Sequence, residues 1–256
     1  MEEYLASIYF DPEHPASFSG PDKLYKTVKE EGRFDVSHQQ ISQWLQAQEA
    51  YTLHHEVRTD FPRNRVVVGE IDQQWDLDTA NMVSFSKKNK GFNYILVAID
   101  IFSRYLWTRP LKTKLGKEMV EALKSIFEEG RRPLKIRSDK GGEFVNRQVS
   151  AYLKRENIHH FVTQNEVKCS HAERMIKTLK NRISHYFTHK QTHEWVDVLQ
   201  DFTKSYNHTF HRSIGISPAQ VTKEKESKLW LHQYLPPPKV KKRAEKAYTN
   251  EDSVEI

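Results

Sequence analysis

The stretch Leu134-Lys135-Ile136-Arg137-Ser138-Asp139-Lys140-Gly141-Gly142-Glu143-Phe144 predicts a short strand over residues 134–138, followed by a tight turn. Asp139 stands where the strand ends and the chain turns. An aspartate followed by Lys-Gly-Gly can be turn chemistry alone. The same position also presents a carboxylate at a strand end, where groups from other parts of the chain can meet it.

The sequence on both sides of this stretch alternates between strand and helix patterns. Residues 66–68 open a β-rich region, and residues 74–82, 91–100 and 104–111 predict three closely spaced strands, an order that favours a meander. Helices are predicted over residues 117–129, 143–156, 173–187 and 193–210, with a further strand over 158–162. This order predicts an α/β fold in which helices flank a mixed β-sheet.

Two more carboxylates occupy comparable positions. Asp78 lies in the strand predicted over residues 74–82, and Glu173 begins the helix predicted over 173–187. Asp78 could simply face solvent, and Glu173 could cap its own helix, because Ser170-x-x-Glu173 is a capping box. Metal-dependent phosphoryl chemistry, however, needs carboxylates that converge from different elements, and Mg²⁺ prefers such hard oxygen ligands. As an ordered set, Asp78, Asp139 and Glu173 predict such a site.

Five ordered motifs carry a resemblance to a known superfamily. They are Trp75-Asp76-Leu77-Asp78, the run over residues 94–105 with its Asp100-Ile101-Phe102-Ser103-Arg104, the Ser138–Phe144 turn, Ala172-Glu173-Arg174, and Tyr206-Asn207 with His211 and Ser213. Together they resemble the catalytic core of retroviral-type integrases and DDE transposases, most closely the integrases of Maverick/Polinton-type elements. The resemblance implies an RNase H-like fold for this α/β region.

The resemblance also implies a chemistry and a set of partners. Asp78, Asp139 and Glu173 would be the catalytic residues and would bind two Mg²⁺ or Mn²⁺ ions, whereas Asp76 and Asp100 would not be ligands. The implied activity is 3′-end processing and strand transfer during DNA integration, by a homo-oligomer acting on DNA. Relatives carry a C-terminal DNA- or chromatin-binding module for which no strand pattern is visible here.

Basic residues around Glu173 are candidates for DNA contact. Lys177 and Lys180 follow Glu173 by four and seven residues, which places them on its helix face. A lysine beside a catalytic carboxylate can hold a DNA phosphate. Arg174 and Lys168 would extend this rim. The alternative is a solvated basic stripe.

The chain divides into four predicted regions. Residues 1–53 form a small helical unit, in which a helix over 22–31 ends at Gly32 and Ser37-x-x-Gln40 caps a second helix. These helices could be a DNA-binding helix-turn-helix or a docking hairpin. Residues 54–64 predict a linker, 65–221 the core, and 222–256 a basic, disordered tail without helical periodicity.

The composition of the chain limits the classes of protein to which it can belong. The 256 residues carry a formal net charge of +6, which permits polyanion binding. No apolar run long enough to span a membrane is present, and the single cysteine excludes a His-His-Cys-Cys zinc unit. The expected location is intracellular, nuclear or cytoplasmic. The competing hypothesis is a domesticated, catalytically inactive module that binds nucleic acid or protein. The intact acidic set argues against it, and the unseen C-terminal module argues for it.

Overall fold

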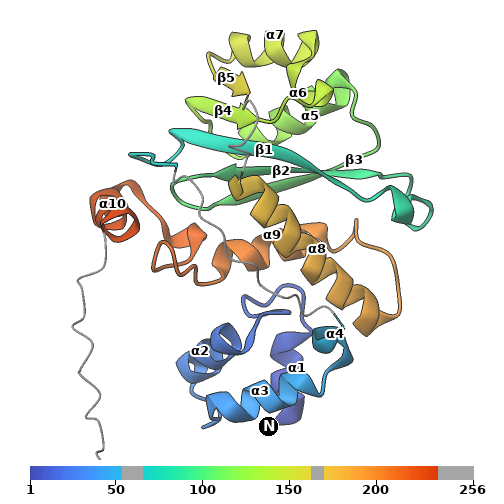
Figure 1. Ribbon diagram of the computed structural model, residues 1–256, viewed down its shortest axis with the longest axis vertical. Helices are drawn as coiled ribbons and strands as arrows, with labels where there is room; N and C mark the ends of the chain where they lie inside the picture. The colour runs from blue at the N-terminus through green and yellow to red at the C-terminus, as the bar shows by residue number, and fades with distance from the viewer. Residues whose placement is uncertain (54–65, 163–169, 236–256) are drawn as a thin grey trace, which may run out of the picture.

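The computed structural model describes residues 1–53, 66–162 and 170–235 (Figure 1). Its centre is a five-stranded sheet with the order β3-β2-β1-β4-β5. The strands are β1 (Gln74–Asn81), β2 (Tyr94–Asp100), β3 (Leu106–Leu111), β4 (Lys135–Ser138) and β5 (His159–Val162). β1, β2 and β3 form the expected antiparallel meander, and β4 and β5 extend it in parallel. The prediction of a mixed sheet is confirmed.

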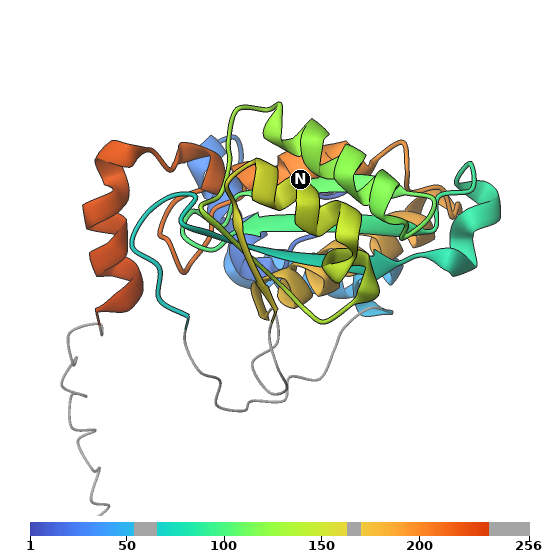
Figure 2. The same ribbon diagram turned by 90° about the horizontal axis from the view of Figure 1, so that it is seen from above.

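Helices cover both faces of the sheet, as Figure 2 shows from above. One face carries α5 (Gly116–Phe127), the short α6 (Gly142–Val145) and α7 (Arg147–Arg155). The other carries α8 (Ser170–Lys190) and α9 (Leu199–His208). Alternation along β2 explains this layering, because Leu96 and Ala98 pack with α5 and α7 while Ile95 and Val97 pack with α8.

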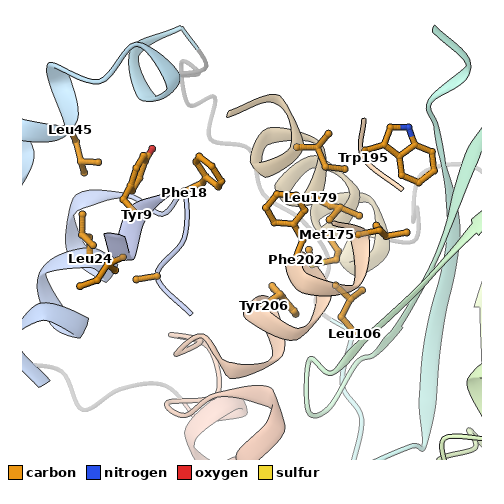
Figure 3. Close-up of a cluster of buried hydrophobic side chains, with 14 of the residues drawn as sticks. Tyr9, Phe18, Leu24, Leu45, Leu106, Met175, Leu179, Trp195, Phe202 and Tyr206 are labelled. Carbon is orange, nitrogen blue, oxygen red and sulfur yellow. The ribbon is translucent and has the colours of Figure 1, made fainter. Parts of the chain in front are cut away.

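The N-terminal unit consists of α1 (Glu2–Tyr9), α2 (Pro21–Glu31), α3 (His38–Gln46) and α4 (Glu49–Thr52). The predicted Gly32 C-cap (φ 64°) and the Ser37–Gln40 capping box are both present. The unit docks on α8 and α9, and one continuous apolar cluster joins the two parts. Figure 3 shows this cluster, with Tyr9, Phe18, Leu24 and Leu45 on the N-terminal side and Met175, Leu179 and Phe202 on the other.

A third apolar cluster attaches α10 (Glu226–Tyr234) to the core through Leu229, Val68 and Phe102. Short 3₁₀ turns at η2 (Pro218–Gln220) and η3 (Lys223–Lys225) lead into this helix. The prediction of a disordered tail without helical periodicity over 222–256 was therefore wrong for residues 226–234. The amphipathic signal of α10 is weak because only a narrow face of the helix is buried. The linker over 54–64 and the tail beyond 235 lie outside the described residues.

Three other boundaries differ from the sequence prediction. Residues 66–68 form no strand, although Val68 is buried. The helix expected over 143–156 is broken at Asn146, whose extended backbone ends α6 and whose side chain caps α7 by accepting from Val149 N. α9 begins at Leu199 rather than 193, because the buried Asn89 side chain binds the backbone amides of Trp195 and Val196. The 3₁₀ helix η1 (Val83–Lys88) precedes Asn89.

Candidate active site

The backbone pairing of β1 with β4 aligns two of the predicted carboxylates. Gln74 lies opposite Lys135 and Asp76 opposite Arg137, an offset of 61 residues (135 − 74 = 61). The same offset places Asp78 opposite Asp139 (139 − 78 = 61), the first residue after β4. Neighbouring strands lie about 4.8 Å apart, so the register brings the two residues to adjacent positions at one edge of the pairing.

The third carboxylate comes from the first turn of α8. Ala172 and Met175 are buried against the sheet in the same cluster as Ala80 of β1, which fixes the start of this helix over β1. Burial raises the pKa of Asp78 to about 6, and the negative charges of Asp139 and Glu173 push it in the same direction. Asp139 and Glu173 are therefore each close enough to Asp78 to repel its carboxylate.

The three candidate carboxylates differ in how far they are exposed to solvent. Asp78 and Glu173 are half-buried, and Asp139 is exposed. Asp78 Oδ1 accepts a hydrogen bond from Thr79 N at 2.7 Å, and Asp139 Oδ1 accepts one from Gly141 N at 3.0 Å. The site is thus anchored on β1 and open at Asp139, which suits a substrate too large to enter an enclosed pocket.

A fourth carboxylate, Glu143, borders this site. Its Oε1 atom accepts a hydrogen bond from Thr79 Oγ1 at 2.9 Å and forms an ion pair with Lys114. A β-carbon on Gly141 would meet Glu143 Oε2 at 2.6 Å and Asp139 Oδ1 at 2.9 Å, so both carboxylates flank this glycine. Sequence analysis did not single out Lys114, because its contact with Glu143 crosses the sheet edge and no local spacing signals it.

Asp76 and Asp100 each form ion pairs and hydrogen bonds within the fold. Asp76 is fully buried, and Arg137 donates to both of its oxygens at 2.8 and 2.6 Å. His171 Nδ1 lies 3.4 Å from the same carboxylate. Asp100 accepts from Ser103 N at 3.0 Å and pairs with Arg131, which closes the turn between β2 and β3.

The predicted DNA-contacting residues lie along the exposed side of α8. Arg174 and Lys177 are exposed and Lys180 is half-buried, while Met175 and Leu179 on the same helix face the core. The helix is continuous from Ser170 to Lys190, so the predicted spacing of Glu173, Lys177 and Lys180 applies. Lys168 lies outside the described residues.

The carboxylate set is chemically suited to a divalent cation. Hard carboxylate oxygens are the ligands that Mg²⁺ and Mn²⁺ favour, and a cation would offset the negative charges that add to burial in raising the pKa of Asp78. Within residues 1–53, 66–162 and 170–235, no three histidine, cysteine or acidic side chains are already gathered in a metal-binding geometry.

Comparison with known proteins agrees with this geometry. Residues 70–166 match the family described as Integrase core domain. The match includes Asp78 and Asp139 and ends before Glu173. A transposon-derived protein of Caenorhabditis elegans is 40% identical over 141 residues, which are 55% of this chain and 49% of that protein. The retrovirus-related Pol polyprotein from transposon 297 of Drosophila melanogaster is 26% identical over 134 residues, 52% of this chain.

The chain spans about half the length of the first relative and 13% of the second. A solved structure, the simian T-cell lymphotropic virus intasome in complex with PP2A regulatory subunit B56 gamma, matches 96% of this chain and 77% of its own with a TM-score of 0.59 and 15% identity. The fold is therefore the RNase H-like fold of integrase catalytic cores. Residues 70–166 are thus similar to an integrase core domain.

No relationship to Maverick/Polinton-type elements in particular emerges from these comparisons. That part of the resemblance stays a prediction. In the described residues no helix is long and apolar enough to cross a membrane.

Proposed function

We propose that this chain is a DNA integrase or transposase of a mobile element, which processes DNA 3′ ends and transfers them to target DNA. One observation carries the proposal: the β1–β4 register aligns Asp78 with Asp139, and α8 brings Glu173 within electrostatic reach of Asp78. The integrase core match over residues 70–166 supports the same reaction class.

In this proposal each group has a defined task. Asp78, Asp139 and Glu173 hold two Mg²⁺ or Mn²⁺ ions, which would supply charge stabilisation at the scissile phosphate during in-line displacement. Arg174, Lys177 and Lys180 hold the DNA backbone beside the carboxylates, because their side chains line the open face of α8. Lys168 extends this rim, and the enzyme acts as a homo-oligomer in the nucleus or cytoplasm.

The test is Asp139→Asn in the purified chain. Nicking of supercoiled plasmid DNA reports a single strand break at any sequence, so it requires no knowledge of the recognised ends. We expect the wild-type chain to nick and join DNA only with Mg²⁺ or Mn²⁺, and Asp139→Asn to lose at least about 100-fold in rate. Asp139 is exposed, so the variant should keep its fold.

Glu121→Gln is the matched control, because Glu121 is an exposed carboxylate on α5 that lies outside the site. It should nick DNA at the wild-type rate. Retained metal-dependent nicking by Asp139→Asn would contradict the assignment of the site. DNA binding without cleavage by the wild-type chain at every Mg²⁺ and Mn²⁺ concentration would favour the catalytically inactive binding module instead.

A further inference from the structure

A polar cluster lies two residues before the candidate carboxylates, on the same three elements. Its members are Asp76 on β1, Arg137 on β4 and His171 in the first turn of α8. We call these three residues the anchoring cluster. Because the cluster and the carboxylate set occupy the same three segments, a contact that fixes the first also limits where the second can lie.

The pair of Asp76 and Arg137 joins β1 to β4 beneath α8. The two residues lie opposite one another in the parallel pairing, and Arg137 Nε and Nη2 donate to the two oxygens of Asp76 at 2.8 and 2.6 Å. Asp76 is fully buried and Arg137 is 3% exposed. Asp76 points to the face that α8 covers, because Ala80, four residues later, packs in the same cluster as α8. A bidentate pair fixes orientation as well as distance, so it gives α8 a rigid point of contact.

His171 brings the first turn of α8 to this point. Its Nδ1 atom is closed to solvent and lies 3.4 Å from Asp76 Oδ2. The next residue, Ala172, is fully buried in the apolar cluster that joins α8 to the sheet. Successive helix residues differ in direction by about 100°, so His171 and Glu173 flank Ala172 on opposite sides. His171 therefore meets Asp76 on one side, and the charge of Glu173 acts on Asp78 on the other.

The spacing along β1 agrees with this arrangement. Asp76 and Asp78 are about 6.8 Å apart along the strand, a distance that two side chains on opposite flanks of a helix can span. Figure 1 shows α8 beginning at the sheet and running toward the N-terminal unit, where it contacts α4. A rotation or slide of the first turn that separates His171 from Asp76 would therefore also displace Glu173 from Asp78.

We propose that His171 is a positioning residue for the reaction, whose contact with the Asp76–Arg137 pair fixes the first turn of α8 and thereby holds Glu173 in place to bind a metal ion. The inference rests on the proposed function, because it gives His171 a task in the metal site of that reaction. His171 acts through the backbone of α8 and is not itself a ligand. The contact requires a proton on Nδ1, which the neutral and the charged imidazole can both carry.

The experiment measures Mn²⁺ binding to the full chain by electron paramagnetic resonance of the free ion, together with metal-dependent plasmid nicking. His171→Leu and His171→Asn form the test pair, because the two side chains have nearly the same shape and only asparagine carries an N–H near the position of Nδ1. His171→Leu should bind Mn²⁺ and nick DNA on the order of tenfold less well. His171→Asn should stay within about threefold of the wild type in both measurements.

Two controls separate positioning from a general loss of structure. His208→Ala removes an exposed histidine of α9 and should match the wild type in Mn²⁺ binding and nicking. Binding of a labelled DNA duplex without divalent cations should stay within about twofold of the wild type in both His171 variants, because the basic side chains of α8 are retained. A merely structural role predicts lower stability in urea with unchanged Mn²⁺ affinity of the folded protein.

The outcomes separate this inference from the proposed function. Wild-type Mn²⁺ affinity in His171→Leu would overturn the inference, and so would an equal loss in His171→Leu and His171→Asn, while metal-dependent nicking by the wild type would leave the proposed function standing. If His171→Leu does not fold, His171→Gln takes its place, because its amide lies near the position of Nε2 and should show the same loss. If the wild-type chain neither binds Mn²⁺ nor nicks DNA, the proposed function itself fails.

Discussion

Asp76 and Asp78 are two residues apart on one strand and point to the same face of the sheet, yet their surroundings give them opposite properties. Burial alone would raise the pKa of Asp76, but His171 and Arg137 hold it below its usual value. Asp78 has no such cation in direct contact among the described residues and feels two neighbouring negative charges. The first carboxylate is therefore suited to holding the fold and the second to holding a cation.

Asp76→Asn should destabilise the protein without directly altering the candidate active site. Removing this charge takes the Asp76 carboxylate away from the buried Arg137, and breaking a buried ion pair typically costs about 3–5 kcal/mol. We expect the free energy of unfolding in urea to fall by about 3 kcal/mol. A loss below about 1 kcal/mol would contradict the structural role of the pair.

Asp78→Asn should change the pH dependence of stability. The folded protein holds a proton on Asp78 up to about pH 6, whereas the unfolded chain releases it near pH 4. Since the folded state binds the proton more tightly, the free energy of unfolding falls as pH rises from about 4 to about 6. Asparagine cannot ionise, so Asp78→Asn should not lose this stability as the pH rises.

With divalent cations chelated, Asp78→Asn should therefore match the wild type at pH 4 and exceed its stability by about 1–2 kcal/mol at pH 7. Urea unfolding at several pH values measures this difference. A constant difference between pH 4 and pH 7 would show that the Asp78 carboxyl does not carry a raised pKa.

Side chains of α9 fasten the edge strand β3 at two points, Thr108 and Leu106, and Asn207 makes the contacts with Leu106. Asn207 is 3% exposed, accepts from Leu106 N at 2.8 Å and donates to Leu106 O at 2.9 Å. Asn207→Ala leaves both backbone groups of the fully buried Leu106 without these partners. We expect a loss of about 2 kcal/mol in unfolding free energy, measured in urea. His208→Ala, at the next and exposed position, should change stability by less than about 0.5 kcal/mol.

Sequence reasoning located the strands of the sheet well because their apolar periodicity reflects burial on two faces. It failed where one side chain decides a helix boundary, as Asn146 does between α6 and α7 and Asn89 does before α9. It also missed α1 and α4, which are short, and α10, whose buried face is narrow. Such contacts depend on distant parts of the chain and leave no local pattern.

In the candidate site, too, some features could be predicted from the sequence and others depend on tertiary packing. Asp78, Asp139 and Glu173 were predicted from motif order, while the alignment of Asp78 with Asp139 depends on the strand register and the position of Glu173 on the packing of α8 over β1. The ion pair of Lys114 with Glu143 arises from tertiary packing alone. No sequence spacing would have indicated it.

The N-terminal unit and the core share one apolar cluster and should unfold together. Phe18, 6% exposed, packs its ring against His185 and Phe202, with centroid distances of 5.8 and 6.2 Å. Phe18→Ala should lower the unfolding free energy by about 3 kcal/mol. Native-state hydrogen exchange should show the same loss of protection for the slowest amides of α3 and of β2. Loss confined to α3 would show that the two parts open independently.

The alignment of Asp78 with Asp139 is produced by backbone pairing, not by contacts of their side chains. Inserting one residue within β1 or β4 would reverse which way every later side chain points and would turn one carboxylate to the opposite face. Lengthening the loop between β3 and α5 would leave this pairing untouched. Related chains that keep the chemistry should therefore vary in length between strands β1 and β4, while these two strands tolerate substitutions but neither insertions nor deletions.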